Sequence, residues 1–345
     1  MNIVQVSRRP FAGQFSIEGQ FDCLRAQMQR AGSQTSHFVV PYCSKGIVRR
    51  ALNCWSACRQ RADVYHVTGD IHYAAMFLPG DRTVLTIHDC GTLERLRGIK
   101  RWLLKTFWFD LPIRRARYIT VISEETKRQL QHHVSVAGEK IHVVPDVVSP
   151  VYQPYARPFN GDCPRILQIG TKDNKNLIRL AEALRGIRCH LHIVGRLSDR
   201  QRCSLQECGV DFSSECDLSE AAMYDCYCAA DIVSFVSTYE GFGLPIVEAN
   251  AVGRPVVTSN VSSMPEVAGR AACLVDPFDV DSIRSGIRLV VDEPEYRDGL
   301  VRAGFENVKR FRADAVAEQY LSLYGRVARQ GVPSPAVSPV SAGRA

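Results

Sequence analysis

The sequence contains thirteen cysteines but no Cys-x-x-Cys pair. Because the count is odd and the chain has 345 residues, a disulfide framework of the kind that holds small secreted domains together is not expected. The cysteines are instead expected to be reduced thiols in a cytoplasmic protein. Cys203, Cys208 and Cys216 are weak candidates for a metal cluster, and the alternative is that they are buried or incidental thiols.

Long hydrophobic runs are also missing. No stretch approaches about 18 uninterrupted apolar residues, so no transmembrane helix is expected. Arg8, Arg9 and Pro10 interrupt the only early apolar run, which argues against a secretory signal. Neither a zinc-finger spacing nor a long arginine run is present, and the net charge of +7 is modest. This charge suits anionic ligands or an acidic membrane surface and does not indicate a nucleic-acid partner.

The sequence does contain a repeated alternation of short β-rich apolar runs and longer helical stretches. Such an alternation is typical of parallel sheets, because neighbouring parallel strands need crossover connections. The loop after the first strand lacks the pattern G-x-G-x-x-G, so a dinucleotide fingerprint is not supported. Strands are expected at 2–6, 37–40, 64–67, 83–87, 118–122 and 141–145 in the first half, and at 165–170, 190–194 and 231–236 in the second. Helices are expected at 17–31, 177–184, 245–252 and 280–291, with one or two more over 296–325.

The most informative stretch is 237–250, with the sequence Ser-Thr-Tyr-Glu-Gly-Phe-Gly-Leu-Pro-Ile-Val-Glu-Ala-Asn. It follows a predicted buried strand, turns at two glycines and starts a helix near Pro245, where a missing N–H costs nothing. The N-terminus of a helix offers unpaired N–H groups and the positive end of the dipole, which together bind anions. Glu240 before the turn and Glu248, expected in the first helical turn, then suit the hydroxyls of a sugar or ribose beside a phosphate. Either glutamate alone would more simply be solvated or complement the dipole.

This pair of glutamates around Gly-Phe-Gly-Leu-Pro resembles the donor-site signature of the retaining family 4 glycosyltransferases of GT-B fold. The stretches 251–257 and 264–267 are similar to the same family. The resemblance implies an α/β fold of two Rossmann-like, doubly wound domains that face each other across a cleft. It implies a nucleotide-sugar donor, a saccharide or lipid-linked acceptor, and a place in bacterial cell-surface polysaccharide synthesis. It also implies a retaining reaction without a protein nucleophile, and no metal or cofactor apart from the nucleotide sugar as co-substrate.

The resemblance assigns the donor side to the second domain. It implies that Glu240 holds sugar hydroxyls and that Glu248 holds the ribose. Fixed N–H groups and cations can stabilise the charge that develops on the leaving diphosphate. The residues implied to supply these N–H groups are Phe242, Gly243 and Leu244.

A second loop, 170–177, follows a predicted strand and carries two lysines at the ligand edge of the sheet. The residues themselves leave two interpretations open, cations for a diphosphate or solvated side chains. The resembling family carries a basic residue at the position of Lys175. It often has an arginine where this chain has Thr171, so the second phosphate-binding cation is in doubt, and Lys172 is the candidate to replace it.

Polar residues also follow the predicted strands of the first half, where ligands of open α/β sheets bind. A histidine at the position of His88 lines the cleft near the transferred sugar in the resembling family, so His88 joins Glu240 and Lys175 as a catalytic candidate. A lone histidine is otherwise more often structural. Ser123 is expected to be the N-cap of a helix. The acceptor-side candidates are Gly13, His66, Asp70 and Asp89.

The segment 93–109 mixes basic residues with Trp and Phe. Such a stretch either lies on an anionic membrane or packs by its aromatics and leaves a solvated basic face. A cytoplasmic location, with peripheral contact at the inner face of the membrane under the first alternative, is therefore expected. The domains are predicted as an acceptor-side domain at 1–157, a donor domain at 158–310, a helix returning to the first domain at 311–330, and a disordered tail at 331–345.

Two rival functions use the same donor pocket. One is a GT-B epimerase or phosphorylase, which would turn over donor without an acceptor or depend on inorganic phosphate. The other is a non-catalytic sugar-nucleotide-binding protein, which would bind donor without transferring the sugar.

Overall fold

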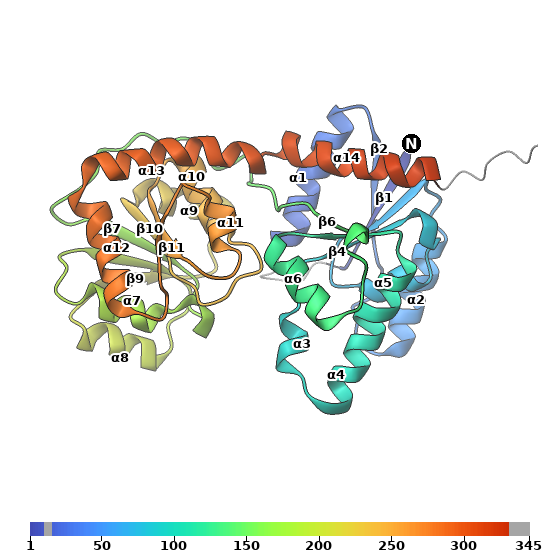
Figure 1. The fold of residues 1–345 in the computed structure, drawn as a ribbon, viewed down its shortest axis with the longest axis horizontal. Helices are drawn as coiled ribbons and strands as arrows, with labels where there is room; N and C mark the ends of the chain where they lie inside the picture. The colour runs from blue at the N-terminus through green and yellow to red at the C-terminus, as the bar shows by residue number, and fades with distance from the viewer. Residues whose placement is uncertain (10–15, 331–345) are drawn as a thin grey trace, which may run out of the picture.

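The computed structural model describes residues 1–9 and 16–330. Gly13 and the tail 331–345 lie outside this range, so what the sequence predicts for them stays a prediction. Within it, the chain forms two six-stranded sheets in which every strand pairing is parallel. Figure 1 shows that the two sheets belong to separate domains that lie side by side. The predicted α/β fold of two doubly wound domains is confirmed.

The first sheet has the strand order β2-β1-β3-β4-β5-β6 and the second the order β12-β11-β10-β7-β8-β9. The strands of the first sheet are β1 (Asn2–Ser7), β2 (Gln34–Val39), β3 (Val64–Val67), β4 (Thr83–Ile87), β5 (Tyr118–Val121) and β6 (Ile141–Val143). Those of the second are β7 (Arg165–Ile169), β8 (His190–Val194), β9 (Asp211–Glu215), β10 (Ile232–Phe235), β11 (Val256–Ser259) and β12 (Cys273–Val275).

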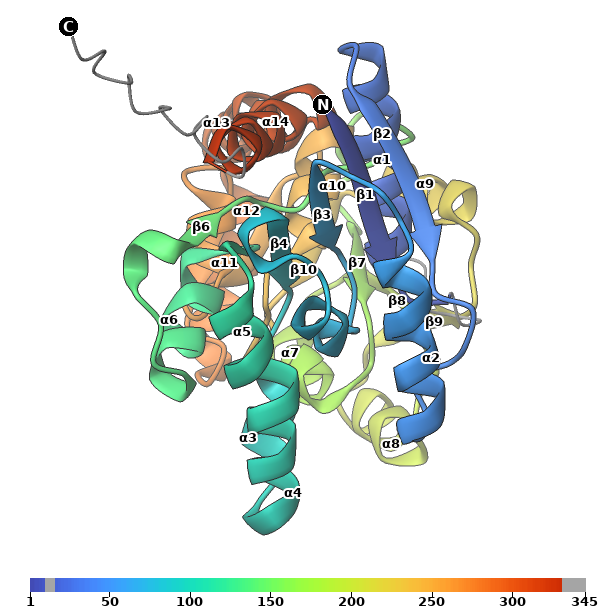
Figure 2. The same cartoon turned by 90° about the vertical axis from the view of Figure 1, so that its right-hand side faces the viewer.

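Helices connect these strands and cover both faces of each sheet (Figures 1 and 2). The helices of the first domain are α1 (Ser16–Arg30), α2 (Ile47–Cys58), α3 (Gly91–Arg95), α4 (Gly98–Leu104), a π-helix (Lys105–Asp110), α5 (Leu111–Arg115) and α6 (Glu124–His133). Those that follow are α7 (Leu177–Leu184), α8 (Asp199–Glu207), α9 (Glu220–Ala229), α10 (Leu244–Val252), α11 (Met264–Ala268), α12 (Val280–Asp292), α13 (Pro294–Asn307) and α14 (Ala313–Gln330). Short 3-10 helices occupy His72–Met76, Gly80–Arg82, Gly138–Lys140, Asp173–Lys175 and Val308–Phe311.

Burial explains which strands the sequence reveals. β3, β4 and β10 are buried at every position, as expected for parallel strands with helices on both faces, and such strands read as apolar runs. Strand β9 leaves no apolar run in the sequence, because its residues are mostly polar and are partly or fully exposed at the edge of the sheet. The short strands β11 and β12, of four and three residues, were not predicted either.

The last helix returns to the first domain. α13 lies on the second domain, and α14 continues from it across the first domain, beside α1 (Figures 1 and 2). Tyr320 and Tyr324 of α14 belong to one buried cluster with Phe21 and Leu24 of α1. The chain thus crosses between the domains twice, through the irregular segment between β6 and β7 and through the junction of α13 and α14.

Candidate donor site

The site is built on the turn between β10 and α10. Gly243 has φ +119°, in the region that side chains rarely adopt, and this lets α10 start directly after the strand. No side chain caps the N-terminus of α10, so its first N–H groups are offered to a ligand. The helix ends at Gly253, as the sequence predicts.

Lys175 and Glu240 meet at this turn. Lys175 Nζ donates to Glu240 Oε1 at 2.6 Å, and the two side chains are 18% and 15% exposed. Asn174 Nδ2 lies 3.2 Å from the same carboxylate oxygen and 2.9 Å from the carbonyl oxygen of Tyr239. The two loops that the sequence singled out therefore form one site, with a cation and a carboxylate in contact beside a helix N-terminus.

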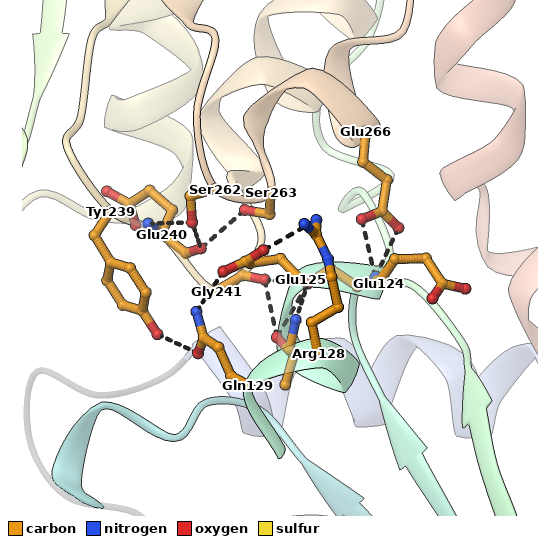
Figure 3. A network of polar contacts seen from close by, with 12 residues as sticks. Glu124, Glu125, Arg128, Gln129, Tyr239, Glu240, Gly241, Ser262, Ser263 and Glu266 are labelled. Carbon is orange, nitrogen blue, oxygen red and sulfur yellow. Dashed lines mark hydrogen bonds and ion pairs between the residues drawn. The ribbon is translucent and has the colours of Figure 1, made fainter. Parts of the chain in front are cut away.

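Two serines that carry no local sequence signal, Ser262 and Ser263, hold the backbone of Glu240. The N–H of Glu240 donates to Ser262 Oγ at 3.2 Å, and this hydroxyl donates to the carbonyl oxygen of Glu240 at 2.7 Å. Ser263 Oγ lies 2.9 Å from the same carbonyl and 2.5 Å from that of Phe242. Figure 3 shows both serines above the donor loop, residues 237–243 between β10 and α10. They fix the position from which the Glu240 side chain extends.

Glu248 does not lie in the first turn of the helix, so that prediction is wrong. α10 begins at Leu244, its first turn has no acidic residue, and Glu248 is one residue further on. Its carboxylate accepts a hydrogen bond from the Tyr227 hydroxyl. Burial raises the pKa of Glu248 to about 7, while hydrogen bonds from Tyr227 and Tyr152 oppose the shift. The carboxyl group therefore titrates near neutral pH.

A pocket of about 620 Å³ extends from Glu248 to the first domain. The donor domain contributes Leu244 and Glu248 of α10 and residues around the start of α9. The first domain contributes Gly19 and Gln20 of α1, and the interdomain segment closes the pocket with 149–152. A ligand held by α10 would thus be enclosed by both domains.

His88 reaches the same region from the first domain. It is 7% exposed, and its Nε2 lies 2.9 Å from the carbonyl oxygen of Thr68. Because a carbonyl can only accept, Nε2 is the donor of this hydrogen bond. A Cβ added to Gly241 would lie 3.0 Å from the His88 carbonyl oxygen. The backbone of His88 therefore lies against Gly241, the residue after Glu240, while its ring bonds to Thr68 within the first domain.

The acceptor-side candidates differ in exposure: Asp89 and Asp70 are exposed, whereas His66 is buried. Asp89 is exposed beside the donor loop, and its carboxylate accepts from the N–H of Gly91 at 2.9 Å. Asp70 is exposed and pairs with Arg8 at 3.1 Å. His66 is fully buried, with Nδ1 2.6 Å from the Tyr324 hydroxyl and Nε2 2.6 Å from the Thr86 hydroxyl. Burial lowers the pKa of His66 to about 3. Since both ring nitrogens are engaged under α14, the geometry argues against the predicted acceptor contact.

The remaining donor-side candidates surround the ion pair. Lys172 is exposed at the start of the 3-10 helix that carries Lys175. Thr171 Oγ1 donates to the backbone carbonyl oxygen of Arg196 at 2.7 Å, while the exposed Arg196 side chain pairs with Asp217 at 2.6 Å. Phe242 is buried, so only its backbone can face a ligand.

Nothing in the described residues forms a metal centre. No group of three or more His, Cys, Asp or Glu side chains in this part of the chain could hold a metal ion, and the cysteine trio is free thiols. The single Asp-x-Asp sequence of the chain, at 279–281, caps α12, where Asp279 Oδ1 accepts from the N–H of Asp281 at 2.9 Å. In the described residues, no helix is long and apolar enough to cross a membrane.

The chain has two α/β domains with parallel sheets, and a glycine turn, a helix N-terminus and a Lys–Glu pair lie near their junction. These features define a glycosyltransferase of GT-B fold. Family models agree with this class. Residues 29–151 match Glycosyltransferase Family 4, and residues 163–293 match Glycosyl transferases group 1. The chain belongs to this family of glycosyltransferases.

Curated relatives are glycosyltransferases as well. The chain is 41% identical to the O-antigen chain mannosyltransferase B of Escherichia coli over 98 residues, which is 28% of this chain and 26% of that protein. It is 28% identical to the MMP alpha-(1->4)-mannosyltransferase of Mycolicibacterium hassiacum over 314 residues, which is 80% of this chain and 73% of that protein.

Solved structures share the fold at low sequence identity. Sucrose-phosphate synthase from Thermosynechococcus elongatus aligns with a TM-score of 0.75 at 16% identity, over 95% of this chain and 99% of its own. WaaG, a glycosyltransferase involved in lipopolysaccharide biosynthesis, aligns with a TM-score of 0.67 at 16% identity, over 93% and 99%. Anabaena HepE in complex with UDP-glucose aligns with a TM-score of 0.71 at 14% identity, over 94% and 99%.

Proposed function

We propose that this protein transfers a sugar, with retention and without a metal ion, from a nucleotide sugar to a saccharide or lipid-linked acceptor in bacterial cell-surface polysaccharide synthesis. The Lys175–Glu240 pair at the N-terminus of α10 carries this proposal. A cation and helix N–H groups suit a diphosphate, and a carboxylate beside them suits sugar hydroxyls. The mannosyltransferase relatives and the UDP-glucose complex of HepE make GDP-mannose and UDP-glucose the first donors to test.

In the proposed reaction, the bond between the sugar anomeric carbon and the phosphate oxygen breaks, and the diphosphate leaves with the electron pair. The N–H groups of 242–244 and Lys175 stabilise its charge. The acceptor oxygen bonds to the anomeric carbon on the same face, and its proton passes to a phosphate oxygen of the leaving group. Glu240 orients the sugar, Glu248 binds the ribose, and His88 lines the reacting side from the first domain.

The epimerase or phosphorylase and the non-catalytic binding protein are separated from this proposal by experiment. A thermal-shift panel of nucleotide sugars identifies the donor, because a ligand that binds the folded state raises the melting temperature. With that donor, a transferase releases nucleoside diphosphate only when an acceptor is present. Release without an acceptor, or only with inorganic phosphate, would favour the first rival, and binding without any release would favour the second.

We also propose that the first domain contacts an anionic membrane surface, which suits a cytoplasmic enzyme with a lipid-linked acceptor. The segment around α4 divides in two. Trp108 and Phe109 pack against the core of the first domain, as expected if the segment packs by its aromatics. Ile99, Trp102 and Phe107 are 73%, 58% and 45% exposed, and no residue of α4 is buried.

We include α2 in the proposed membrane-contacting surface. Arg50 of α2 lies 4.6 Å from the Trp108 ring and joins α2 to the π-helix. Ile47, Val48 and Trp55 of α2 are 84%, 73% and 60% exposed. The stretches 45–61 and 95–109 each carry five Lys or Arg residues and no Asp or Glu. Exposed aromatics and basic side chains together suit an anionic interface, where each cation adds about 1 kcal/mol.

Vesicle co-sedimentation tests the membrane contact. We expect binding to anionic vesicles at low salt, weakening as salt screens the charges, and little binding to neutral vesicles. Changing the exposed Arg95, Arg97 and Lys100 to Ser should release the protein, whereas the triple change of the exposed Arg188, Arg200 and Arg202 on the other domain should not. Equal recovery with neutral and anionic vesicles would refute the contact.

A further inference from the structure

Helix α6 of the first domain contacts the donor loop of the second domain (Figure 3). Ser123 Oγ, the N-cap of α6, donates to the carbonyl oxygen of Gly241 at 2.7 Å. The Tyr239 hydroxyl donates to Gln129 Oε1 at 2.7 Å. The residues on both sides of Glu240 are thus bonded to the other domain.

A third contact joins the same helix to the donor domain. Both carboxylate oxygens of Glu266, in α11, accept from the N–H of Glu124, at 3.0 and 2.9 Å. The first N–H groups of a helix have no partner within the helix, and a negative charge there interacts favourably with the helix dipole. Glu266 of the second domain therefore supplies a hydrogen-bond acceptor and a negative charge to the N-terminus of α6 in the first domain.

Packing makes the contact close as well as polar. A Cβ on Gly241 would lie 3.0 Å from the His88 carbonyl oxygen and 3.6 Å from Ile122. Ile122 belongs to the first domain, yet it is buried in the donor-domain cluster that contains Phe242. The donor loop has no room to shift toward the first domain and is tied against it by the bonds to α6.

We propose that Glu266 and Tyr239 are positioning residues that hold the donor loop against α6, so that Glu240 is correctly placed only while the two domains are in contact. This inference rests on the proposed function for its catalytic consequence. Its structural part does not depend on catalysis: the N-terminus of α6 and the donor loop keep their backbone hydrogen bonds only while they are in contact with each other.

Hydrogen exchange on the full-length, unliganded protein tests the structural part. In Glu266→Ala, amides at 124–127 should exchange about fivefold faster because the cap is lost, and amides at 239–241 should accelerate with them. Tyr239→Phe removes one hydroxyl and should accelerate both segments without disturbing a cap. The control Glu295→Ala, an exposed glutamate of α13, should change neither segment. Acceleration at 124–127 alone would make Glu266 a helix cap and overturn the proposal.

Steady-state kinetics tests the consequence. In Glu266→Ala, kcat should fall about tenfold through misplacement of Glu240, while the Kd for nucleoside diphosphate stays within about twofold, because Lys175 and α10 lie within one domain. Glu266→Gln should recover part of kcat, since its amide oxygen still accepts an N–H bond. An unchanged kcat, or equal losses in kcat and diphosphate affinity, would overturn the positioning role. If wild-type protein transfers no sugar, the proposed function fails, and hydrogen exchange still decides the structural claim.

Discussion

Replacing Lys175 by Met should weaken nucleoside diphosphate binding, and the structure sets the size of the effect. Met keeps most of the aliphatic stem, which lies against Gly170, and removes the ammonium group, whose nitrogen lies 4.6 Å from the centroid of the Phe235 ring. A charge-assisted hydrogen bond to a phosphate contributes roughly 1.5–3 kcal/mol. Each 1.4 kcal/mol is a factor of ten in Kd. If the whole of this hydrogen-bond energy were lost, Kd for the nucleoside diphosphate would rise about 10- to 100-fold.

The ion pair between Lys175 and Glu240 reduces the expected loss of affinity. In the free protein, Lys175 already donates to Glu240 at 2.6 Å, so a diphosphate competes with the carboxylate for the ammonium group. The expected loss is therefore near the lower end, about tenfold. For the same reason Glu240→Gln, which removes the competing charge, should leave diphosphate affinity unchanged or raise it. The two substitutions are in contact, so their effects on affinity should not add.

Isothermal titration calorimetry measures the Kd of Lys175→Met, Glu240→Gln and Lys172→Met for the nucleoside diphosphate whose sugar derivative is identified by thermal shift. Lys172→Met is the matched control, since Lys172 is an exposed lysine on the same loop. It should change Kd less than about threefold, as a solvated lysine contributes little. Unchanged affinity in Lys175→Met would refute the assignment of this cation. A loss in Lys172→Met alone would move the role to Lys172.

Three further predictions concern the residues around this pair. Glu240→Gln should lower the rate of sugar transfer at least about 100-fold, with the melting temperature within a few degrees of wild type; near-normal turnover would remove Glu240 from the site. Glu248 has a pKa raised from 4.5 to about 7, so the folded protein keeps a proton that the unfolded chain has released; the free energy of unfolding of wild type should fall relative to Glu248→Gln as pH rises from about 5 to about 7, and parallel urea-denaturation profiles for the two proteins would contradict this. Asn176→Ala should lower the free energy of unfolding by about 1–3 kcal/mol, measured by urea denaturation, because the buried amide donates to the carbonyl oxygens of Val236 and Pro277 at 3.0 and 2.7 Å; a change within error would show that water replaces both bonds.

The sequence predicts much of the scaffold because buried parallel strands and capped helices leave local signals. The bounds of β3, β4, β8 and α7 agree with the expected ones. Ser123 is the N-cap that was predicted. The donor loop was also recognisable, since its two glycines and Pro245 lie within five residues, 241–245, and each has a distinct backbone requirement.

Other features depend on long-range contacts and leave no local signal. Ser262 and Glu266 act on residues 22 and 142 positions away in the chain. His66 follows the rule for a ligand at a strand end, but α14, more than 250 residues later, covers it. The segment 95–109 has one composition, yet Trp102 is exposed and Phe109 is buried, because only the tertiary fold decides which aromatics meet the core.

The central claim is that the Lys175–Glu240 site transfers sugar from a nucleotide to an acceptor. The most direct measurement is nucleoside diphosphate release by the full-length protein from GDP-mannose, UDP-glucose and related donors, with and without saccharide and lipid-linked acceptors. We predict release that requires an acceptor, a glycoside product with the anomeric configuration of the donor, and at least about 100-fold slower release in Glu240→Gln. Equal rates in wild type and Glu240→Gln, or inversion of the anomeric centre in the product, would contradict the account.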